Sequence, residues 1–343
     1  MQKVAVLGAG SWGTALAITL ADNQHDVRLW TWEQEHAQVL AEQRENPQFL
    51  KGCRLPDNVW VTSDLEEGLH RASMVVISVP SHAVREVTRK SRKYIDEDAY
   101  IVNTAKGLEL ETLKRLSEVI QEEVPAALMD KVAVLSGPSH AEEVGQRMPT
   151  TIVAAAKKRT AAEWVQDLFM NNNFRVYTNP DVIGVELGGA LKNVIALATG
   201  ISDGLDLGDN TKAALMTRGI AEIGRLGVQL GAHPMTFAGL AGIGDLIVTC
   251  TSMHSRNRRA GMQLGQGMKL EEVLEKMGMV VEGVRSTKAA YQLSRENGVE
   301  MPITEQVYRV LYEGQDPAKG VGRLMGRGKT KEIEEVVLDS KHW

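Results

Sequence analysis

A lysine stands inside a long apolar run in the second half of the chain, where a charged side chain is unexpected. Lys192 follows Gly188 and Gly189 in the segment GVELGGALKNVIALA at 184–198. In a helix the two glycines share a face with the lysine, because residues three and four apart are neighbours. A buried ammonium is costly unless it is paired or used, so the spacing indicates room for a ligand beside a functional lysine. The alternative is a lysine that reaches the surface while the glycines let another helix pack closely.

A second apolar segment, GIGDLIVTCT at 242–251, carries a single carboxylate. Asp245 is either the N-cap of a helix that begins near Leu246 or the partner that a buried Lys192 needs. Thr249 follows one helical turn later, on the same face as Asp245. The sequence leaves both interpretations of the aspartate open.

Polar and basic residues follow directly, in the sequence SRNRR at 255–259. Ser255 is typical of an N-cap, which places Arg256 and Asn257 in the first turn of a helix. Free N–H groups, a hydroxyl, an amide and a guanidinium at a helix start suit a phosphate group. The alternative, a solvated basic helix face, accounts well enough for Arg258 and Arg259.

Three glycines near the N-terminus form a GxGxxG motif, at Gly8, Gly10 and Gly13. The motif lies between an apolar strand and a helix, and this context predicts a dinucleotide site. Its glycines allow a tight turn and let a pyrophosphate approach the helix N-terminus. The next strand ends in LWTWE at 29–33, where the acid comes late and no arginine stands at 31 or 32. The sequence therefore leaves the choice between NAD and NADP open.

The elements that must position these residues change in kind near the middle of the chain. Short apolar strands alternate with helices in the first half, and we expect strands at 4–7, 27–30, 74–79, 100–103, 132–135, 150–155 and 174–177. Such nearly continuous apolar runs predict a parallel sheet that helices cover on both faces. After Asn179-Pro180-Asp181, a turn that opens a helix, the pattern is helical. The predicted fold is an α/β Rossmann-type dinucleotide-binding domain at 1–180, followed by an all-α substrate and catalytic domain at 181–343.

Ligands of such sheets bind beyond the carboxyl ends of the strands, where this chain has three polar loops. They read SVPSH at 78–82, NTAKGLE at 103–109 and SGPSHA at 136–141. Lys106 lies among small residues, an open setting for a cation that meets an anionic or carbonyl ligand, and an ordinary surface lysine is the alternative. Ser139 could cap the helix that follows. We expect His82 and His140 to be loop or capping residues rather than catalysts.

Composition excludes several classes of function. The net charge is −5 and no basic tract is long, which argues against a nucleic-acid partner. Cys53 and Cys250 have no disulfide or metal-site spacing, and no HExxH occurs, so we expect no metal. No signal-peptide pattern and no uninterrupted apolar run of about 18–20 residues is present, so we expect a cytoplasmic protein without a membrane partner. The charged end at 323–343 is expected to be partly disordered.

Taken together, these segments resemble the bacterial NAD(P)-dependent glycerol-3-phosphate dehydrogenases. The similar blocks are GAGSWGTALA at 8–17, SVPSH at 78–82, TAKGLE at 104–109, SGPS at 136–139, GVELGGALKNVIA at 184–196, GIGDLIVTCT at 242–251, SRNRR at 255–259 and VVEG at 280–283. The resemblance implies a helical domain like that of 6-phosphogluconate dehydrogenase. It also implies reversible hydride transfer between dihydroxyacetone phosphate and sn-glycerol 3-phosphate with NAD or NADP, which supplies phospholipid synthesis, and a homodimer.

The same resemblance implies roles for individual residues. Lys192 becomes the general acid and base, and Lys106, Asp245, Asn193 and Thr249 lie near the chemistry. The substrate site comprises Lys106, Gly137, Ser139, Lys192, Asp245, Ser255, Arg256 and Asn257. The cofactor site comprises Gly8, Gly10, Ser11, Trp12, Gly13, Trp32, Lys106, Ala141, Arg256, Val280 and Glu282. The pair Thr31-Trp32 departs from the family's pattern at the adenosine end.

The implied reaction places a demand on the charge of Lys192. The side chain must be protonated to donate a proton to a ketone oxygen and neutral to accept one from an alcohol. Burial and the cations Lys106 and Arg256 would lower its pKa, whereas Asp245 would raise it. The sequence leaves this balance open.

Two other functions are compatible with parts of this pattern. Another β-hydroxyacid-type dehydrogenase would share the two-domain plan and a helical lysine, although SRNRR favours phosphate over carboxylate. A non-catalytic NAD(P)-binding protein would need the glycine motif alone. The joint presence of Lys106, Lys192 and Asp245 argues against that second alternative.

Overall fold

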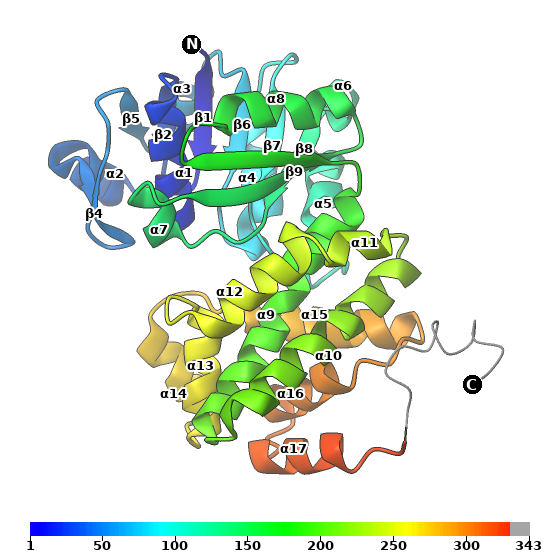
Figure 1. The fold of residues 1–343 in the computed structure, drawn as a ribbon. Helices are drawn as coiled ribbons and strands as arrows, with labels where there is room; N and C mark the ends of the chain where they lie inside the picture. The colour runs from blue at the N-terminus through cyan, green and yellow to red at the C-terminus, as the bar shows by residue number, and fades with distance from the viewer. Residues whose placement is uncertain (330–343) are drawn as a thin grey trace.

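The computed structural model describes residues 1–329, which form an N-terminal part built on a sheet and a C-terminal part built of helices (Figure 1). The sheet has eight strands in the order β10-β9-β8-β7-β6-β1-β2-β5. Its strands are β1 (Lys3–Leu7), β2 (Asp26–Trp30), β5 (Val59–Thr62), β6 (Met74–Ile77), β7 (Tyr100–Asn103), β8 (Val132–Ser136), β9 (Thr150–Ala156) and β10 (Phe174–Asn179). A separate antiparallel hairpin consists of β3 (Glu45–Asn46) and β4 (Leu50–Arg54).

Helices cover both faces of the sheet, as the apolar strands predict. They are α1 (Ser11–Asp22), α2 (Gln34–Gln43), α3 (Leu65–Leu69), the 3₁₀ turn η1 (Ser81–Ala83), α4 (Val84–Ser91), α5 (Leu116–Glu123), α6 (Ala126–Met129), α7 (Ala141–Gly145) and α8 (Arg159–Phe169). Alternate residues of β1 lie in different cores: Val4 and Val6 pack in one cluster, and Ala5 and Leu7 pack in the other. β1, in the middle of the sheet, is therefore buried from both sides.

One pair of strands corrects the expectation of a parallel sheet. β9 runs antiparallel to β8, with Ser136 opposite Val153, whereas β10 is parallel to β9. Between β8 and β9 the chain forms only the short helix α7, which spans roughly 8 Å at 1.5 Å per residue. A strand of the length of β8 spans roughly 16 Å, so α7 does not return the chain to the starting end of β8.

The C-terminal part surrounds one central helix, α9 (Val182–Gly204). Around it lie α10 (Gly208–Gln229), α11 (Pro234–Phe237), the π-helical turn η2 (Leu240–Gly244), α12 (Asp245–Thr251), α13 (Arg256–Gly265), α14 (Leu270–Met277), α15 (Glu282–Glu296), α16 (Pro302–Tyr312) and α17 (Pro317–Met325). The expected all-α character holds for the described residues from 181 to 329. The expectation of an α/β Rossmann-type part followed by a helical part is confirmed.

Two stretches of this part, residues 182–204 and 234–251, are long and apolar enough to cross a membrane by length and composition, although neither is an uninterrupted apolar run, because Lys192 and Asp245 interrupt them. However, 94% of the apolar window in 182–204 is buried, which is typical of the core helix of a globular protein. The second stretch is divided among α11, η2 and α12.

The two parts are joined at the start of α9. Asp181 caps this helix, and its Oδ1 accepts a hydrogen bond of 2.9 Å from the Gly184 N–H. Val182 and Val185 pack with Val134 and Val153 of the sheet, so the first turn of α9 shares a core with the N-terminal part. The domain boundary at 180 and 181 accordingly stays a prediction. The C-terminal tail at 323–343 begins inside α17, and its residues 330–343 lie outside the described residues.

Candidate functional site

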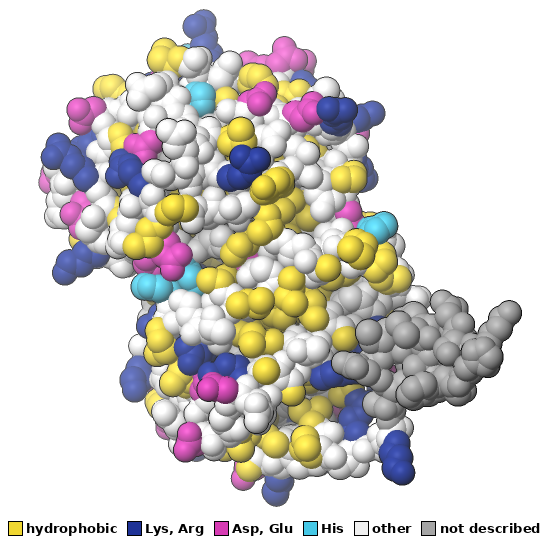
Figure 2. Space-filling model, viewed as in Figure 1, with side chains coloured by type: hydrophobic (Ala, Val, Ile, Leu, Met, Phe, Trp, Pro, Cys, Tyr) yellow, Lys and Arg dark blue, Asp and Glu magenta, His cyan; other side chains and the backbone are white. Residues whose placement is uncertain are grey.

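A cleft of about 860 Å³ lies between the carboxyl ends of the strands and the helical part. Both parts contribute to its walls, which is the usual position of ligand sites in such folds. Figure 2 shows the waist between the two lobes, with histidine and acidic side chains gathered at one edge of it. Almost all of the residues predicted from the sequence line this cleft.

The glycine turn after β1 has the shape that a dinucleotide needs. Gly8 has a φ of +116°, and a Cβ there would lie 2.6 Å from the carbonyl oxygen of Ser78. A Cβ on Gly13 would lie 1.8 Å from the Gly8 carbonyl oxygen, so only glycine lets α1 approach the turn. At Gly10 nothing lies within 4 Å of the Cβ position, and this side of the turn is open.

The first turn of α1 supplies the donors for an anion. The backbone N–H groups of residues 11–13 have no acceptor among residues 1–329, and no acidic residue lies in this turn. An open glycine face beside a helix N-terminus fits a pyrophosphate. The residues present therefore fit a nicotinamide dinucleotide, with Gly8, Gly10, Ser11 and Trp12 lining the cleft and Gly13 supporting the turn from below.

The hairpin formed by β3 and β4 closes the adenosine end of this groove, and it was missing from the sequence prediction. Gln48 and Phe49 line the cleft, and Ser11 Oγ donates a 2.6 Å hydrogen bond to the Phe49 carbonyl oxygen. The strands are short and rich in polar residues and glycine, so the sequence carries no apolar alternation that would reveal them. Trp32 stands at the rim and is 76% exposed.

One buried carboxylate joins two lysines at the inner end of the cleft. Asp245 Oδ1 lies 2.6 Å from the Nζ of Lys192, and its Oδ2 lies 2.5 Å from the Nζ of Lys106. The Lys106 Nζ also donates to the carbonyl oxygen of Gly137 at 3.0 Å, and the Lys192 Nζ donates to the Thr249 hydroxyl. The partner proposed for a buried Lys192 is thus present, and the interpretation of Lys192 as a surface-reaching lysine is wrong.

Three separate elements deliver these side chains. Lys192 projects from the middle of α9, Lys106 follows β7 in a loop that turns at Gly107 (φ +155°), and Asp245 opens α12 directly after η2. The alternative reading of Asp245 as an N-cap is wrong, because the capping position is Gly244 and the carboxylate makes no cap hydrogen bond. Thr249 lies one turn later, as predicted, and its hydroxyl donates to the Asp245 carbonyl oxygen at 2.6 Å.

The charges in this cluster shift one another. Burial, assisted by Lys106, lowers the pKa of Lys192 to about 8 and outweighs the opposing effect of Asp245. Burial alone would raise the pKa of Asp245, but Lys106 and Lys192 together hold it below its ordinary value. The carboxylate is therefore ionised, and Lys192 exchanges a proton near neutral pH.

The two glycines that precede Lys192 make room for protein rather than for a ligand. A Cβ on Gly188 would lie 2.5 Å from the carbonyl oxygen of Ala241, and one on Gly189 would lie 2.7 Å from Ser136 Oγ. They let η2 and the end of β8 reach α9 closely. This corrects the expectation of a space for a ligand at these positions, and the alternative of close packing is right.

The start of α13 forms the far wall of the inner cleft. Ser255 is the N-cap, as predicted, and its hydroxyl accepts from the Arg258 N–H at 3.2 Å. The N–H groups of Arg256 and Asn257 have no acceptor among residues 1–329. One side-chain amide is already engaged, since Asn257 donates to Asn193 at 2.8 Å and accepts from the Gly283 N–H at 2.9 Å. The backbone at this helix start, rather than the Asn257 side chain, is open to an anion.

Two predicted cofactor residues also connect parts of the chain. Glu282, at the start of α15, accepts hydrogen bonds from the Ser81 N–H at 3.0 Å and the Ser81 hydroxyl at 2.7 Å, which links α15 to the loop after β6. The carbonyl oxygen of Val280 accepts from the Arg256 guanidinium at 2.9 Å. The first contact holds the helical wall against the loop after β6, and the second joins two segments of that wall.

Of the predicted site residues, only Gly13 and Gly137 do not line the cleft. Gly137 acts through Lys106, as described above. Ser139 lines the cleft together with Ala141. It does not cap α7, since the capping position is His140 and the Ser139 hydroxyl donates to the Gly137 carbonyl oxygen at 2.9 Å.

His140, expected to be a loop or capping residue, reaches across the cleft to the Val248 carbonyl oxygen (3.4 Å), and burial lowers its pKa. A lone histidine after a strand gave no signal for that contact.

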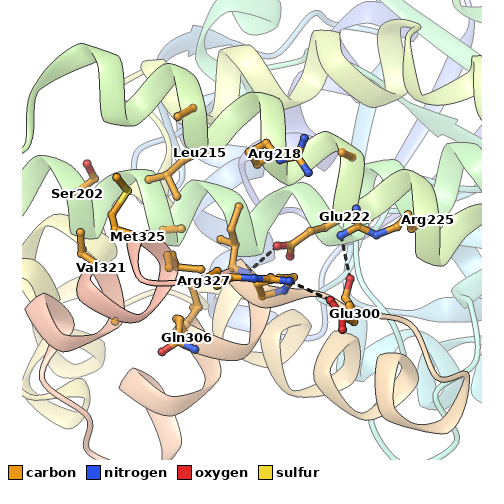
Figure 3. Close-up of a pocket in the computed structure, with 18 of the residues that line it drawn as sticks. Ser202, Leu215, Arg218, Glu222, Arg225, Glu300, Gln306, Val321, Met325 and Arg327 are labelled. Atoms are coloured by element: carbon orange, nitrogen blue, oxygen red, sulfur yellow. Dashed lines mark hydrogen bonds and ion pairs between the residues drawn. The ribbon is translucent and has the colours of Figure 1, made fainter. Parts of the chain in front are cut away.

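A larger cavity, of about 1120 Å³, lies within the helical part among α10, α16 and α17 (Figure 3). Four of its charged groups, Glu222, Arg225, Glu300 and Arg327, are bound to one another or to the backbone. Arg225 donates to the Glu300 carbonyl oxygen, Arg327 pairs with the Glu300 carboxylate, each at 2.9 Å, and Glu222 accepts from the Ile303 N–H at 2.6 Å. The predicted site residues line the smaller cleft instead. Among the described residues, no group of three His, Cys, Asp or Glu side chains could hold a metal ion.

Comparisons with known proteins agree with this geometry. Residues 3–162 match the family model for the N-terminus of NAD-dependent glycerol-3-phosphate dehydrogenase, and residues 181–322 match the model for its C-terminus. The glycerol-3-phosphate dehydrogenase [NAD(P)+] of Pelotomaculum thermopropionicum is 61% identical over 336 residues, which cover 98% of this chain and 96% of the relative. That of Moorella thermoacetica is 60% identical over 97% of this chain and 98% of the relative.

Solved structures give the same result. The crystal structure of glycerol-3-phosphate dehydrogenase from Coxiella burnetii is 40% identical, with a TM-score of 0.90, and the match covers 95% of this chain and 99% of that chain. Both family models, the full-length relatives and this structure thus agree on one family. The chain belongs to the NAD-dependent glycerol-3-phosphate dehydrogenase family.

Proposed function

We propose that this protein is an NAD(P)-dependent glycerol-3-phosphate dehydrogenase that interconverts dihydroxyacetone phosphate and sn-glycerol 3-phosphate. The observation that carries the proposal is the buried Lys192–Asp245–Lys106 cluster between a dinucleotide turn and an open helix start. Hydride exchange with a ketone needs a proton donor at the ketone oxygen. Family membership supports the identity of the substrate, which the relatives carry in their names.

Lys192 is the group that moves the proton. When bound, the nicotinamide supplies or accepts the hydride. In the reducing direction the Lys192 ammonium stabilises the growing negative charge on the substrate oxygen and donates the proton. In the oxidising direction the neutral amine accepts it. A pKa of about 8 keeps both forms accessible near neutral pH, while Asp245 and Thr249 hold the nitrogen in place.

The phosphate of the substrate would bind at the start of α13. The free N–H groups of Arg256 and Asn257 and the Arg256 guanidinium offer donors there. Lys106, bound to Asp245 and to the Gly137 carbonyl oxygen, faces the same space. Binding of the phosphate at this position would orient the carbonyl group toward Lys192.

The test is the loss of reduced-nicotinamide absorbance on addition of dihydroxyacetone phosphate. We expect turnover by the wild-type protein, and we expect Lys192→Ala to lower kcat by a factor of about 10² to 10⁴, which is typical for loss of a general acid. Dinucleotide binding should change little. Lys157→Ala, which removes an exposed lysine between β9 and α8, is the control and should match wild type. Near-normal turnover by the Lys192 variant would disprove its role.

Neither alternative has an observation of its own in its favour. A carboxylated substrate is less suited than a phosphate to a helix start with free N–H groups. A protein that only senses NAD(P) has no use for the buried pair of Lys192 and Asp245 with Lys106 beside it, because buried charges cost stability. We therefore propose no second function.

We further propose a cytoplasmic homodimer that supplies glycerol 3-phosphate to phospholipid synthesis, with no nucleic-acid or membrane partner. Exposed apolar side chains over α10 to α12 support a contact between copies (Figure 2), because apolar patches on a surface often mark interfaces. They include Leu207, Val228, Met235, Ile243 and Ile247. Sedimentation at micromolar concentration tests the dimer, and a monomer mass would contradict it.

A further inference from the structure

The adenosine end of the cleft is built around the end of β2. The Gly8 N–H donates to the Trp30 carbonyl oxygen at 2.9 Å, which fixes the residues after β2 beside the dinucleotide turn. Residues 30–33, His36 and the hairpin tip at 48–49 line this end. In dinucleotide folds the adenosine ribose lies at this position, and its 2′ substituent meets the residues that follow the strand.

Most polar groups around this position are already engaged inside the protein. The Thr31 hydroxyl is buried and shares a 3.2 Å hydrogen bond with His36 Nδ1, while His36 Nε2 lies 3.4 Å from Asn46 Oδ1. Both ring nitrogens of the histidine therefore have partners. The groups left to meet a ribose are the exposed side chains of Trp32, Glu33 and Gln48, and Glu33 is the one that carries a charge.

The arginines of the neighbouring elements have partners outside this end of the cleft. Arg44 donates to the carbonyl oxygens of Val59, at 2.8 Å, and of Pro56. Arg28 pairs with Asp26 at 3.1 Å and stacks over the ring of Trp60. Among the described residues that line this end of the cleft there is no lysine or arginine, and Glu33 is the one carboxylate.

Glu33 is free to interact with a ligand. It occupies the N-cap position of α2, yet its side chain makes no capping hydrogen bond, and Glu35 follows in the first turn. These two carboxylates oppose the attraction that a helix N-terminus otherwise has for an anion. A ribose hydroxyl can donate to the Glu33 carboxylate, whereas a 2′-phosphate would be repelled by it.

Resting on the proposed function, we propose that this protein uses NAD(H) in preference to NADP(H), and that Glu33 is the residue that determines this preference. Trp32 offers the adenine an exposed aromatic face. The preference arises because the site gives the 2′-hydroxyl an acceptor and gives a 2′-phosphate no cation.

Calorimetric titration with ADP-ribose and with its 2′-phosphate tests this without any turnover. We expect ADP-ribose to bind at least about tenfold more tightly, which corresponds to about 1.4 kcal/mol. Glu33→Gln should narrow the ratio by roughly fivefold, as expected for removal of one nearby charge at the surface. Glu33→Arg should reverse the preference. The residue is exposed, so folding is not at stake.

Lys51 on β4 provides the control, because it is exposed and is the lysine nearest in sequence to the hairpin tip. Lys51→Ala should leave both affinities unchanged. A selective loss of the 2′-phosphate ligand in that variant would overturn the proposal, since Lys51 would then be the missing cation. Equal binding of both ligands to wild type would overturn it as well. If neither ligand bound, the assignment of the dinucleotide cleft, and with it the proposed function, would fail instead.

Discussion

At the scale of residues, the site depends on one carboxylate that two ammonium groups share. Asp245 has a side chain that is 1% exposed, and it contacts Lys192 and Lys106 at 2.6 and 2.5 Å. Lys106 lowers the pKa of Lys192 and Asp245 raises it. The two neighbours therefore act on the pKa of Lys192 with opposite signs, and their effects can be separated by substitution.

Substitution of these two neighbours should move the pH profile of glycerol 3-phosphate oxidation in opposite directions. Oxidation needs neutral Lys192, so its kcat should rise with pH through a midpoint near 8 in wild type. Lys106→Met removes a cation and should shift this midpoint to higher pH, because the Lys192 ammonium becomes easier to retain. Asp245→Asn removes the anion and should shift it to lower pH.

The measurement is kcat against pH at saturating substrate, and the informative quantity is the midpoint rather than the height of the curve. Both variants are expected to lose activity, because both residues face the substrate space. Equal shifts of the same sign would contradict the electrostatic account of Lys192. Asp245→Asn should also lower the free energy of unfolding by about 3–5 kcal/mol, since it leaves buried cations without their partner.

The residues of this cluster differ in how far the sequence reveals them. Lys192 was conspicuous because an ionised side chain interrupts an apolar run, and Ser255 because its type fits a helix start. Asp245 remained ambiguous, since its contact with Lys106 spans 139 residues. Contacts between residues so far apart in sequence depend on tertiary packing, and local sequence patterns cannot predict them.

At the scale of elements, α9 approaches its neighbours so closely that several of its positions exclude any side chain. Gly188 faces the backbone of η2, and Gly200 and Gly204 face α13, where added Cβ atoms would lie 2.2 and 2.3 Å from carbonyl oxygens. Backbone atoms cannot turn away as side chains can. The glycines that the sequence marked as ligand space are thus the means by which Asp245 is brought to Lys192.

Gly188→Ala should therefore destabilise the protein, although alanine is the better helix former. Its Cβ would lie 2.5 Å from the Ala241 carbonyl oxygen, directly before the segment that carries Asp245. Overpacking of this kind costs about 1–3 kcal/mol, so the midpoint of urea unfolding should fall. Turnover should fall as well, because η2 must move to make room for the Cβ and Asp245 directly follows η2.

Gly224→Ala in α10 is the matched control. The nearest atom to its Cβ would be a Phe237 ring carbon at 3.9 Å, an ordinary contact. Here alanine should raise stability by up to about 1 kcal/mol, the usual gain in a helix interior. If Gly188→Ala unfolded at the same urea concentration as wild type, the close-packing account would be wrong.

The sequence reveals some elements and hides others for definite reasons. The inner strands β1, β6, β7 and β8 are apolar on both faces. Every strand of the sheet was predicted within two residues at each end, apart from the short β5, which was missed. The hairpin of β3 and β4 was missed because it is polar. The antiparallel placement of β9 was missed because strand direction depends on how far the connecting chain travels, which apolar pattern does not encode.

At the scale of the whole molecule, the two parts are joined by acidic side chains as well as by apolar packing. Glu282 binds Ser81 across the cleft. Glu186 of α9 binds the start of α5, accepting from the Ser117 N–H at 2.8 Å and from the Arg115 guanidinium at 2.8 Å. Lys192 and its surroundings are thus held between the two parts of the chain. The stability of the whole therefore responds to the charge of buried carboxylates.

Glu222 of α10 should make the free energy of unfolding depend on pH between pH 5 and pH 7.5. Its side chain is buried at the wall of the larger cavity (Figure 3) and binds the N–H groups of Ile303 and Thr304 at the start of α16. Burial raises its pKa to about 7, against these hydrogen bonds, from an ordinary value of 4.5. A carboxyl group with a raised pKa contributes stability below pH 4.5, and that contribution is lost as the pH rises through 7.

Glu222→Gln keeps an acceptor for α16 and removes the titration. Relative to wild type, the variant should gain roughly 2.4 kcal/mol in unfolding free energy between pH 5 and pH 7.5, measured by urea unfolding at each pH. His25 and His140, whose pKa values burial lowers, contribute equally to the pH dependence of both proteins, so their contributions cancel in this difference. The pH range of the comparison also stays below the pKa of Lys192, about 8.

Glu305→Gln, on the outer side of α16, should show no such gain, because its pair with Arg309 is half exposed. A constant difference between Glu222→Gln and wild type at both pH values would mean that Glu222 is ionised throughout and that its charge is fully balanced by the helix start.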